Sequence, residues 1–205
     1  MKNRRKVKIL IFDLGNVVLK FSHRKAVRKI AGLSGLPERL IYKSIFSSGI
    51  ERLFDSGRIS AKEFYEKISA KSVKSLAYKD FRQAWADIFK PVPAMDNFLR
   101  KLSRKYTLCL LSNTNAIHFP FVKKNFPITG IFDRYFLSYK LGFCKPDKRI
   151  FREVLKRYNL KAGECVYIDD INEYAAAAKK LGFNAVRHKN IKSLEASLKK
   201  LGVEA

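Results

Sequence analysis

Acidic residues are scarce in this chain: its 205 residues include 18 aspartates and glutamates against 43 lysines and arginines, a formal charge of +25 at pH 7. Such a charge attracts phosphorylated molecules, nucleic acids and anionic surfaces. The basic residues are spread over nearly every segment, however, and no nucleic-acid-binding motif occurs. We therefore expect a solvated basic surface with non-specific affinity for polyanions, no specific nucleic-acid partner, and a substrate that is anionic.

The chain also lacks a cysteine framework and a long apolar run. Cys109, Cys144 and Cys165 are far apart and form no CxxC pair, which argues against a disulfide framework and a zinc site. Cys109 and Cys165 lie in apolar runs typical of a core. Cys144 adjoins Lys145, so an accessible thiol is an alternative at that position. No stretch approaches the roughly 20 apolar residues that span a bilayer. The basic start at residues 1–6 is interpreted as a lead-in to a buried strand rather than a signal peptide, and we expect a cytoplasmic protein without a membrane partner.

Strands and helices alternate through most of the sequence. Apolar runs predict strands at residues 7–12, 107–111, 135–137, 165–168 and 185–186. Helical spacing and end signals predict helices at residues 95–105, from 118, at 149–158, from about 175 to 182, and from 191. This alternation predicts an α/β fold, a Rossmann-like parallel sheet with helices on both faces.

Residues 20–90 differ from the rest because helical periodicity dominates there and no strand pattern is convincing. Ser60 and Glu63 have the spacing of a capping box, which marks the start of one of these helices. We therefore expect two parts: an α/β core formed by residues 1–19 and 91–205, and a small helical cap inserted at residues 20–90.

Polar side chains follow the predicted strands at the points where ligands bind in an open parallel sheet. They are Asp13, Ser112, Asn113, Asp169 and Asp170, joined by Lys145 in a turn before a helix. Each alone is weak evidence, because polar residues often end strands as turn formers or helix N-caps. In combination they predict a site that holds carboxylates, a hydroxyl and an ammonium.

Four stretches resemble, in order, the four motifs of the HAD (haloacid dehalogenase-like) superfamily. They are Ile-Phe-Asp-Leu-Gly-Asn-Val at 11–17, Leu-Ser-Asn-Thr-Asn at 111–115, Lys-Pro-Asp at 145–147 with Ile-Phe at 150–151, and Tyr-Ile-Asp-Asp at 167–170. The inserted helices match the position of the superfamily's small cap. Within the superfamily, the first two motifs and Gly-Arg-Ile-Ser at 57–60 resemble a bacterial branch of sugar-phosphate phosphatases.

The resemblance implies a Mg²⁺-dependent phosphatase that hydrolyses a small phosphorylated metabolite, such as a sugar phosphate, through an aspartyl phosphate on Asp13. It places three residues at the phosphoryl group: Ser112, Asn113 and Lys145. It assigns Mg²⁺ to Asp13, the carbonyl oxygen of Gly15, Asp170 and Asp169, the last directly or through water. Three carboxylates this close would repel one another, and a divalent cation relieves that repulsion.

The second acid of the family pattern is missing. Most HAD phosphatases carry a second aspartate two residues after the nucleophile, and this chain has Gly15 there. Such a general acid–base contributes roughly 10²–10⁴-fold to the rate. Four explanations stay open: a slow enzyme, an acid from the cap or the substrate, a leaving group that needs no proton, or a different reaction. His23 and His118 are the titratable candidates, and a structural role suits each better.

Two other functions stay open. A metal-independent 2-haloacid dehalogenase of the same superfamily would also use Asp13 and lack the second aspartate, but paired acids at 169–170 favour a metal site. A non-catalytic, polyanion-binding HAD-fold protein would fit the charge, but it predicts damage to the nucleophile or the metal ligands, and the sequence shows none.

The cap does not identify a substrate. Helical spacing explains most of its residues as packing. Four residues are candidates to face the site: Phe21, His23, Arg24 and Phe54. The basic helix start at residues 20–29 is interpreted as a solvated face, with steering of anionic substrates as the alternative. The oligomeric state cannot be inferred.

Overall fold

The computed structural model describes residues 6–204, so five residues of the predicted basic lead-in lie outside the described part. One sheet has five strands in the order β5–β4–β1–β6–β7, and all neighbouring pairs are parallel. The strands are β1 (Ile9–Phe12), β4 (Thr107–Ser112), β5 (Arg134–Leu137), β6 (Cys165–Asp169) and β7 (Asn184–Arg187). The predicted α/β class is confirmed, and each predicted strand is found within two residues of its expected ends.

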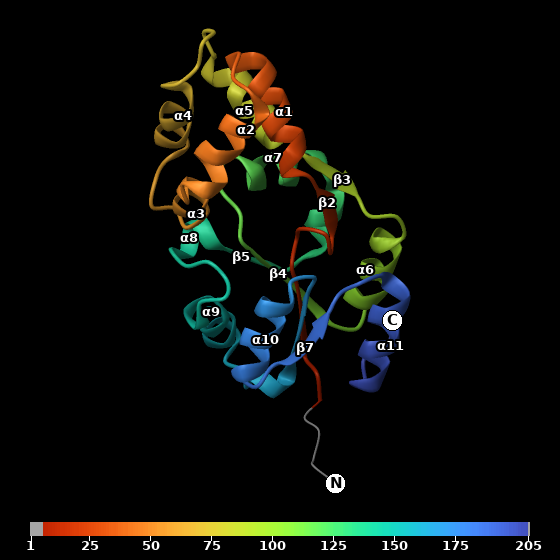
Figure 1. Cartoon of the computed structure of the whole chain (residues 1–205). Helices are drawn as coiled ribbons and strands as arrows, with labels where there is room; N and C mark the ends of the chain where they lie inside the picture. The colour runs from red at the N-terminus through yellow and green to blue at the C-terminus, as the bar shows by residue number, and fades with distance from the viewer. Residues whose placement is uncertain (1–5, 205) are drawn as a thin grey trace.

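Helices cover both faces of this sheet (Figure 1), which explains why its central strands are apolar throughout. Successive side chains of a strand point to opposite faces, so Phe12 of β1 packs into one hydrophobic core and Ile11 into another. The first core includes residues of α6 (Met95–Ser103), α7 (His118–Asn125) and α11 (Ile191–Lys200). The second includes residues of α9 (Lys148–Tyr158) and α10 (Asn172–Lys180). β1 is therefore held from both sides, and its carboxyl end is a rigid place for a functional group.

Five helices occupy the segment between the first strand and the rest of the sheet, and Figure 1 shows them gathered at one end of the molecule. They are α1 (His23–Ser34), α2 (Glu38–Tyr42), α3 (Ile50–Asp55), α4 (Ala61–Ser69) and α5 (Tyr78–Ala86), with a π-helical turn at Lys43–Ser47. The predicted capping box begins α4: Ser60 Oγ accepts a hydrogen bond from the Glu63 amide at 3.2 Å, and the Glu63 carboxylate accepts one from the Ser60 amide at 2.7 Å.

Two short strands at the ends of this segment were not predicted. β2 (Leu19–Phe21) and β3 (Phe89–Pro91) pair antiparallel, so the chain enters and leaves the helical segment side by side. Each strand has only three residues and its partner lies far away in the sequence, so neither shows a periodic pattern of its own. The proposed division at residues 20–90 stays a prediction.

The remaining elements are short: α8 (Ser138–Leu141) and 3₁₀ turns at Pro127–Ile131 and Ala162–Glu164. Within residues 6–204, no helix has both the length and the apolar character required to cross a bilayer. A cytoplasmic location stays a prediction.

Candidate active site

Three carboxylates meet at the carboxyl edge of the sheet. Asp13 directly follows β1, Asp169 is the last residue of β6, and Asp170 comes next. Because β1 and β6 are parallel neighbours, their ends lie together, and one carboxylate oxygen from each of the three residues lies within 4.8 Å of the others. The sequence therefore predicted correctly that these side chains converge.

Lys145 joins two of these carboxylates. Its Nζ lies 2.5 Å from Asp13 Oδ1 and 2.8 Å from Asp169 Oδ2, and it also donates to the Leu111 carbonyl oxygen at 3.1 Å. The Lys145 side chain is 1% exposed, so this is a buried ion-pair network. Sequence analysis placed Lys145 at the same site as Asp13, and the structure shows that it is the ionic partner of Asp13, although the two lie more than a hundred residues apart in the sequence.

The network is short of positive charge. Burial raises the pKa of Asp13 to about 7, with a further rise from Asp169, although Lys145 opposes the shift. Burial alone would lower the pKa of Lys145, but Asp13 and Asp169 raise it above its usual value, so the amine stays charged. One ammonium thus faces three carboxylates, which leaves excess negative charge in a buried place.

This donor set fits a divalent cation that prefers oxygen ligands, such as Mg²⁺. The Asp170 carboxylate accepts a hydrogen bond from Asn16 Nδ2 at 3.2 Å, and burial, the largest of several effects, raises its pKa. Asp169 is oriented by the Tyr167 hydroxyl and by the Ile171 amide, the latter at 2.8 Å. A divalent charge among these carboxylates would offset the excess that Lys145 leaves.

The two polar residues after β4 have different surroundings. Ser112 is 2% exposed, and its hydroxyl donates only a 3.3 Å hydrogen bond to the Asn113 carbonyl oxygen. The Asn113 side chain accepts from the Lys145 amide at 2.7 Å and donates to the Lys145 carbonyl oxygen at 3.1 Å. Asn113 therefore holds the Lys145 turn with its side chain, which leaves its backbone as the part suited to a phosphate.

The Phe21 ring occupies the space where a side chain on Gly15 would lie. A Cβ built on Gly15 would lie 2.6 Å from Cε1 and 2.9 Å from Cδ1 of the Phe21 ring. The space into which a second aspartate would project is thus filled by an aromatic ring from β2. A substitution at Gly15 alone would require this ring to move.

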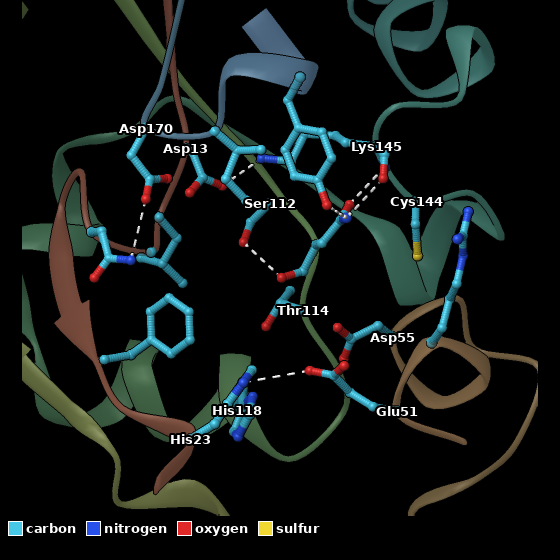
Figure 2. Close-up of a pocket in the computed structure, with 18 of the residues that line it drawn as sticks. Asp13, His23, Glu51, Asp55, Ser112, Thr114, His118, Cys144, Lys145 and Asp170 are labelled. Atoms are coloured by element: carbon cyan, nitrogen blue, oxygen red, sulfur yellow. Dashed lines mark hydrogen bonds and ion pairs between the residues drawn. The ribbon is translucent and has the colours of Figure 1, made fainter. Parts of the chain in front are cut away.

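A cavity of about 390 Å³ separates the carboxylates from the helical segment. Figure 2 shows Asp13 and Lys145 on one side of it, with Glu51 and Asp55 of α3 on the opposite side. Sequence reasoning missed Glu51 and Asp55, although a signal existed: they are two of few acidic residues and their i, i+4 spacing puts both on one helix face.

Two of the four predicted cap residues line this cavity, Phe21 and His23. Arg24 is exposed elsewhere, and Phe54 is 1% exposed within the core. Along the basic helix start, Lys25 and Lys29 pair with Asp87 at 3.2 and 2.7 Å, which accords with a solvated, ion-paired face.

His118 has the surroundings of a structural residue. Its Nε2 lies 2.9 Å from the Trp85 carbonyl oxygen and its Nδ1 lies 3.1 Å from Asn115 Nδ2. A carbonyl can only accept and an amide nitrogen only donate, so the ring is neutral, with its proton on Nε2. Burial, together with the nearby His23, lowers the pKa of His118 to about 3. Asn115 Nδ2 also donates to Asp55 at 2.8 Å and so connects the sheet side to α3.

Cys144 borders the cavity but does not have the character of a reactive thiol. It is 9% exposed, and burial raises its pKa to about 11, so the thiolate is scarce at neutral pH. Cys109 and Cys165 are fully buried, as their apolar surroundings predicted.

Comparison with known proteins agrees with this geometry. The sequence model of the haloacid dehalogenase-like hydrolase family matches residues 7–182. A D-ribitol-5-phosphate phosphatase of Bacteroides thetaiotaomicron is 28% identical over 193 residues, which cover 90% of this chain and 93% of that protein. A sesquiterpene phosphatase of Aspergillus oryzae is 26% identical over 178 residues, 85% of this chain and 86% of that protein.

A solved structure shares the fold over nearly the whole chain. It is a HAD-family enzyme of Bacteroides thetaiotaomicron in complex with magnesium and inorganic phosphate, with a TM-score of 0.78, 28% identity and coverage of 92% of this chain and 98% of that one. The family match spans the inserted helices and, of the parallel sheet, β1, β4, β5 and β6. The chain belongs to the haloacid dehalogenase-like hydrolase family.

Proposed function

We propose that this protein is a Mg²⁺-dependent phosphatase that hydrolyses a small phosphorylated metabolite, a sugar or polyol phosphate, through an aspartyl phosphate on Asp13. The observation that carries the proposal is the network of Asp13, Lys145, Asp169 and Asp170 at the carboxyl edge of the sheet. The D-ribitol-5-phosphate phosphatase and the sesquiterpene phosphatase, relatives over most of the chain, support the reaction class.

Asp13 acts as the nucleophile in this proposal. One of its carboxylate oxygens attacks phosphorus, and the bond from phosphorus to the leaving alcohol oxygen breaks while that oxygen takes a proton from water. Water then attacks the phosphorus of the aspartyl phosphate, which releases inorganic phosphate and restores the carboxylate. Its place directly after the buried β1 holds Asp13 in one orientation, and rigid placement is much of what this reaction requires.

Lys145 and the residues after β4 stabilise the transferring group. The Lys145 ammonium already touches Asp13 Oδ1, so it lies where negative charge gathers as phosphorus approaches. Ser112 Oγ and the backbone of Asn113 supply hydrogen bonds to phosphoryl oxygens. Asn113 also fixes Lys145 from behind through the two hydrogen bonds to its backbone.

Asp13, the Gly15 carbonyl oxygen and Asp170 would hold Mg²⁺, with Asp169 binding directly or through water. When bound, the ion neutralises charge on the phosphoryl oxygens and on the carboxylates. The solved relative in complex with magnesium and inorganic phosphate supports the choice of Mg²⁺ as the ion.

A dehalogenase is the second candidate, because Gly15 removes the acid that most HAD phosphatases have. The acidic trio argues against it, since Asp170 has no evident use in displacing halide and suits a cation. The charge of +25 supports a further, weaker proposal of non-specific polyanion binding, for which elution from heparin at modest salt is the expected result.

The test is the release of inorganic phosphate from a panel of sugar, polyol and nucleotide phosphates, with Mg²⁺ and with EDTA. Phosphate release that depends on Mg²⁺ and is abolished by Asp13→Asn supports the proposal. Halide release from 2-haloacids without metal, together with no phosphate release from any substrate, would support the dehalogenase instead.

A further inference from the structure

Glu51 carries a carboxyl group that the protein leaves almost without partners. It projects from α3 into the cavity, opposite Asp13 (Figure 2). Its carboxyl group contacts His23, with Nε2 3.4 Å from Oε1. No other side chain in the described range 6–204 forms a hydrogen bond or an ion pair with this carboxyl. The group is therefore available to a ligand in the cavity.

A buried hydroxyl in the same cavity also lacks a partner. Thr114 is 3% exposed, it lines the cavity, and its Oγ1 is one of few buried side-chain atoms among the described residues without a hydrogen bond. Figure 2 shows Thr114 between Ser112 and the Glu51–Asp55 pair. Buried hydroxyls in native proteins are nearly always hydrogen-bonded, so this position calls for a group supplied from outside the chain.

Glu51, His23 and Thr114 are neutral at physiological pH. Burial, with a contribution from Asp55, raises the pKa of Glu51 to about 8, and burial lowers the pKa of His23 to about 4. A protonated carboxyl, a neutral imidazole and a threonine hydroxyl can each donate and accept a hydrogen bond. The other ionisable groups that border this region are Arg52, Asp55, His118 and Cys144.

We propose that Glu51, His23 and Thr114 bind hydroxyl groups of the leaving alcohol, so that the substrate is a polyhydroxylated phosphate monoester. The inference rests on the proposed phosphatase function and adds the residues that would recognise the hydroxyl groups of its substrate. An alcohol with hydroxyls satisfies groups that both donate and accept. An apolar alcohol would bury them unpaired, and a site built for hydrogen bonds rejects a ligand that lacks the matching groups.

The experiment compares ribitol 5-phosphate with n-pentyl phosphate, which has the same chain length but no hydroxyls. We expect Glu51→Leu to raise KM for ribitol 5-phosphate about tenfold, the loss expected for one or two hydrogen bonds, and to lower KM for n-pentyl phosphate, because its alkyl chain then buries no unpaired carboxyl group. Glu51→Gln, which still donates and accepts, should stay within about threefold of wild type.

Thr114→Val is the second variant, since valine keeps the shape and removes only the hydroxyl. It should raise KM for ribitol 5-phosphate severalfold, with Tm equal to wild type or higher because an unpartnered buried oxygen is lost. Glu66→Leu is the matched control: Glu66 lies exposed on α4, where it pairs with Lys62 at 3.8 Å, and neither KM should change.

Two results would overturn the inference. If Glu51→Gln and Glu51→Leu both lower kcat on both substrates, Glu51 supplies the leaving-group proton rather than binding hydroxyls. If wild type does not discriminate between the substrates and the variants change nothing, the subsite does not exist.

Binding separates this inference from the proposed function. Calorimetric titration of Asp13→Asn needs no turnover, and we expect ribitol 5-phosphate to bind more tightly than n-pentyl phosphate only while Glu51 is present. If wild type releases no phosphate but this preference is found, the phosphatase proposal fails and the hydroxyl subsite stands. Equal binding of the two compounds contradicts the subsite.

Discussion

The two sides of the cavity differ in the charge of the groups that face it. On the sheet side, Asp13 and Asp169 are tied to Lys145 by contacts of 2.5 and 2.8 Å, and charge is concentrated. On the helical side, Glu51 and His23 meet at 3.4 Å and burial favours the neutral form of each. The sheet side thus suits a charged group, and the part of the helical side formed by Glu51 and His23 suits a neutral polar one.

This difference indicates how the two parts of the chain divide the work. Rigid strand ends carry the groups that would act on phosphorus, where small displacements are costly. In our proposal the inserted helices carry groups that would meet the rest of the substrate, so substitutions there would alter selectivity without touching the reacting atoms. Substitutions on the sheet side should therefore affect the reaction itself, whereas substitutions on the helical side should affect selectivity.

The largest effect is expected from Lys145→Met. Removing the ammonium leaves Asp13 and Asp169 buried without their counter-charge, which typically costs about 3–5 kcal/mol of the free energy of unfolding. Phosphate release should fall by about 10²–10³-fold, as when one transition-state donor is lost. Urea unfolding in EDTA and steady-state phosphate release measure the two effects.

Lys179→Met is the matched control, because Lys179 is exposed near the end of α10. It should change the free energy of unfolding by less than about 0.5 kcal/mol. Wild-type stability of Lys145→Met in EDTA at pH 8 would contradict the description of the sheet side as a charge network.

An intermediate effect is expected from Gly15→Asp. Family comparison alone suggests that this change restores a missing acid, but its Cβ would overlap the Phe21 ring at 2.6 Å. We expect a loss of about 1–3 kcal/mol in the free energy of unfolding, the usual range for overpacking, and no gain in kcat. Thermal unfolding and phosphate release test this.

The double variant Gly15→Asp with Phe21→Ala removes the overlap. It should be less destabilised than the sum of the two single changes, because the clash disappears. A Gly15→Asp single variant that is as stable as wild type and faster would show that Phe21 does not block this position.

The smallest effect is expected from Glu51→Leu on the pH dependence of stability. The folded pKa of Glu51, about 8, lies above its ordinary value of 4.5, so the folded state holds the proton more tightly than the unfolded state. The stability this provides is present below about pH 4.5 and is lost as pH rises through 8.

Glu51→Leu should remove this pH-dependent loss of stability. The difference between the unfolding free energies at pH 5 and pH 8 should then be smaller than in wild type by roughly 1 kcal/mol, a value that allows for solvent in the cavity. Urea unfolding in EDTA at the two pH values measures it, with Glu66→Leu as the control. An unchanged difference would mean that Glu51 is already ionised at pH 5.

Much of the sheet side could be predicted from the sequence because its signals are local. Buried strands are continuous apolar runs, and a polar residue such as Asp13 or Asp169 at the end of a run stands out. Parallel strands then bring these ends together without further information. This rule places the three carboxylates at one edge, and the pairing of β1 with β6 then brings them together.

The helical side could not be predicted because its features depend on contacts between distant segments. The Phe21 ring meets Gly15 only because β2 turns back after the first strand, and β2 finds its partner β3 across five intervening helices. Asp55 meets Asn115 across the same junction. Such contacts leave no periodic pattern in the sequence. For the same reason, sequence analysis considered His118 as a candidate general acid–base, although both of its ring nitrogens form hydrogen bonds within the protein.

The most direct test of the central claim is whether Asp13 becomes phosphorylated. Protein mixed with a phosphorylated substrate and Mg²⁺ is quenched in acid, digested and analysed by mass spectrometry. The account predicts one added phosphoryl group on the peptide that contains Asp13, labile to hydroxylamine and absent from Asp13→Asn. Steady phosphate release without any such adduct, or with Asp13→Asn as active as wild type, would contradict it.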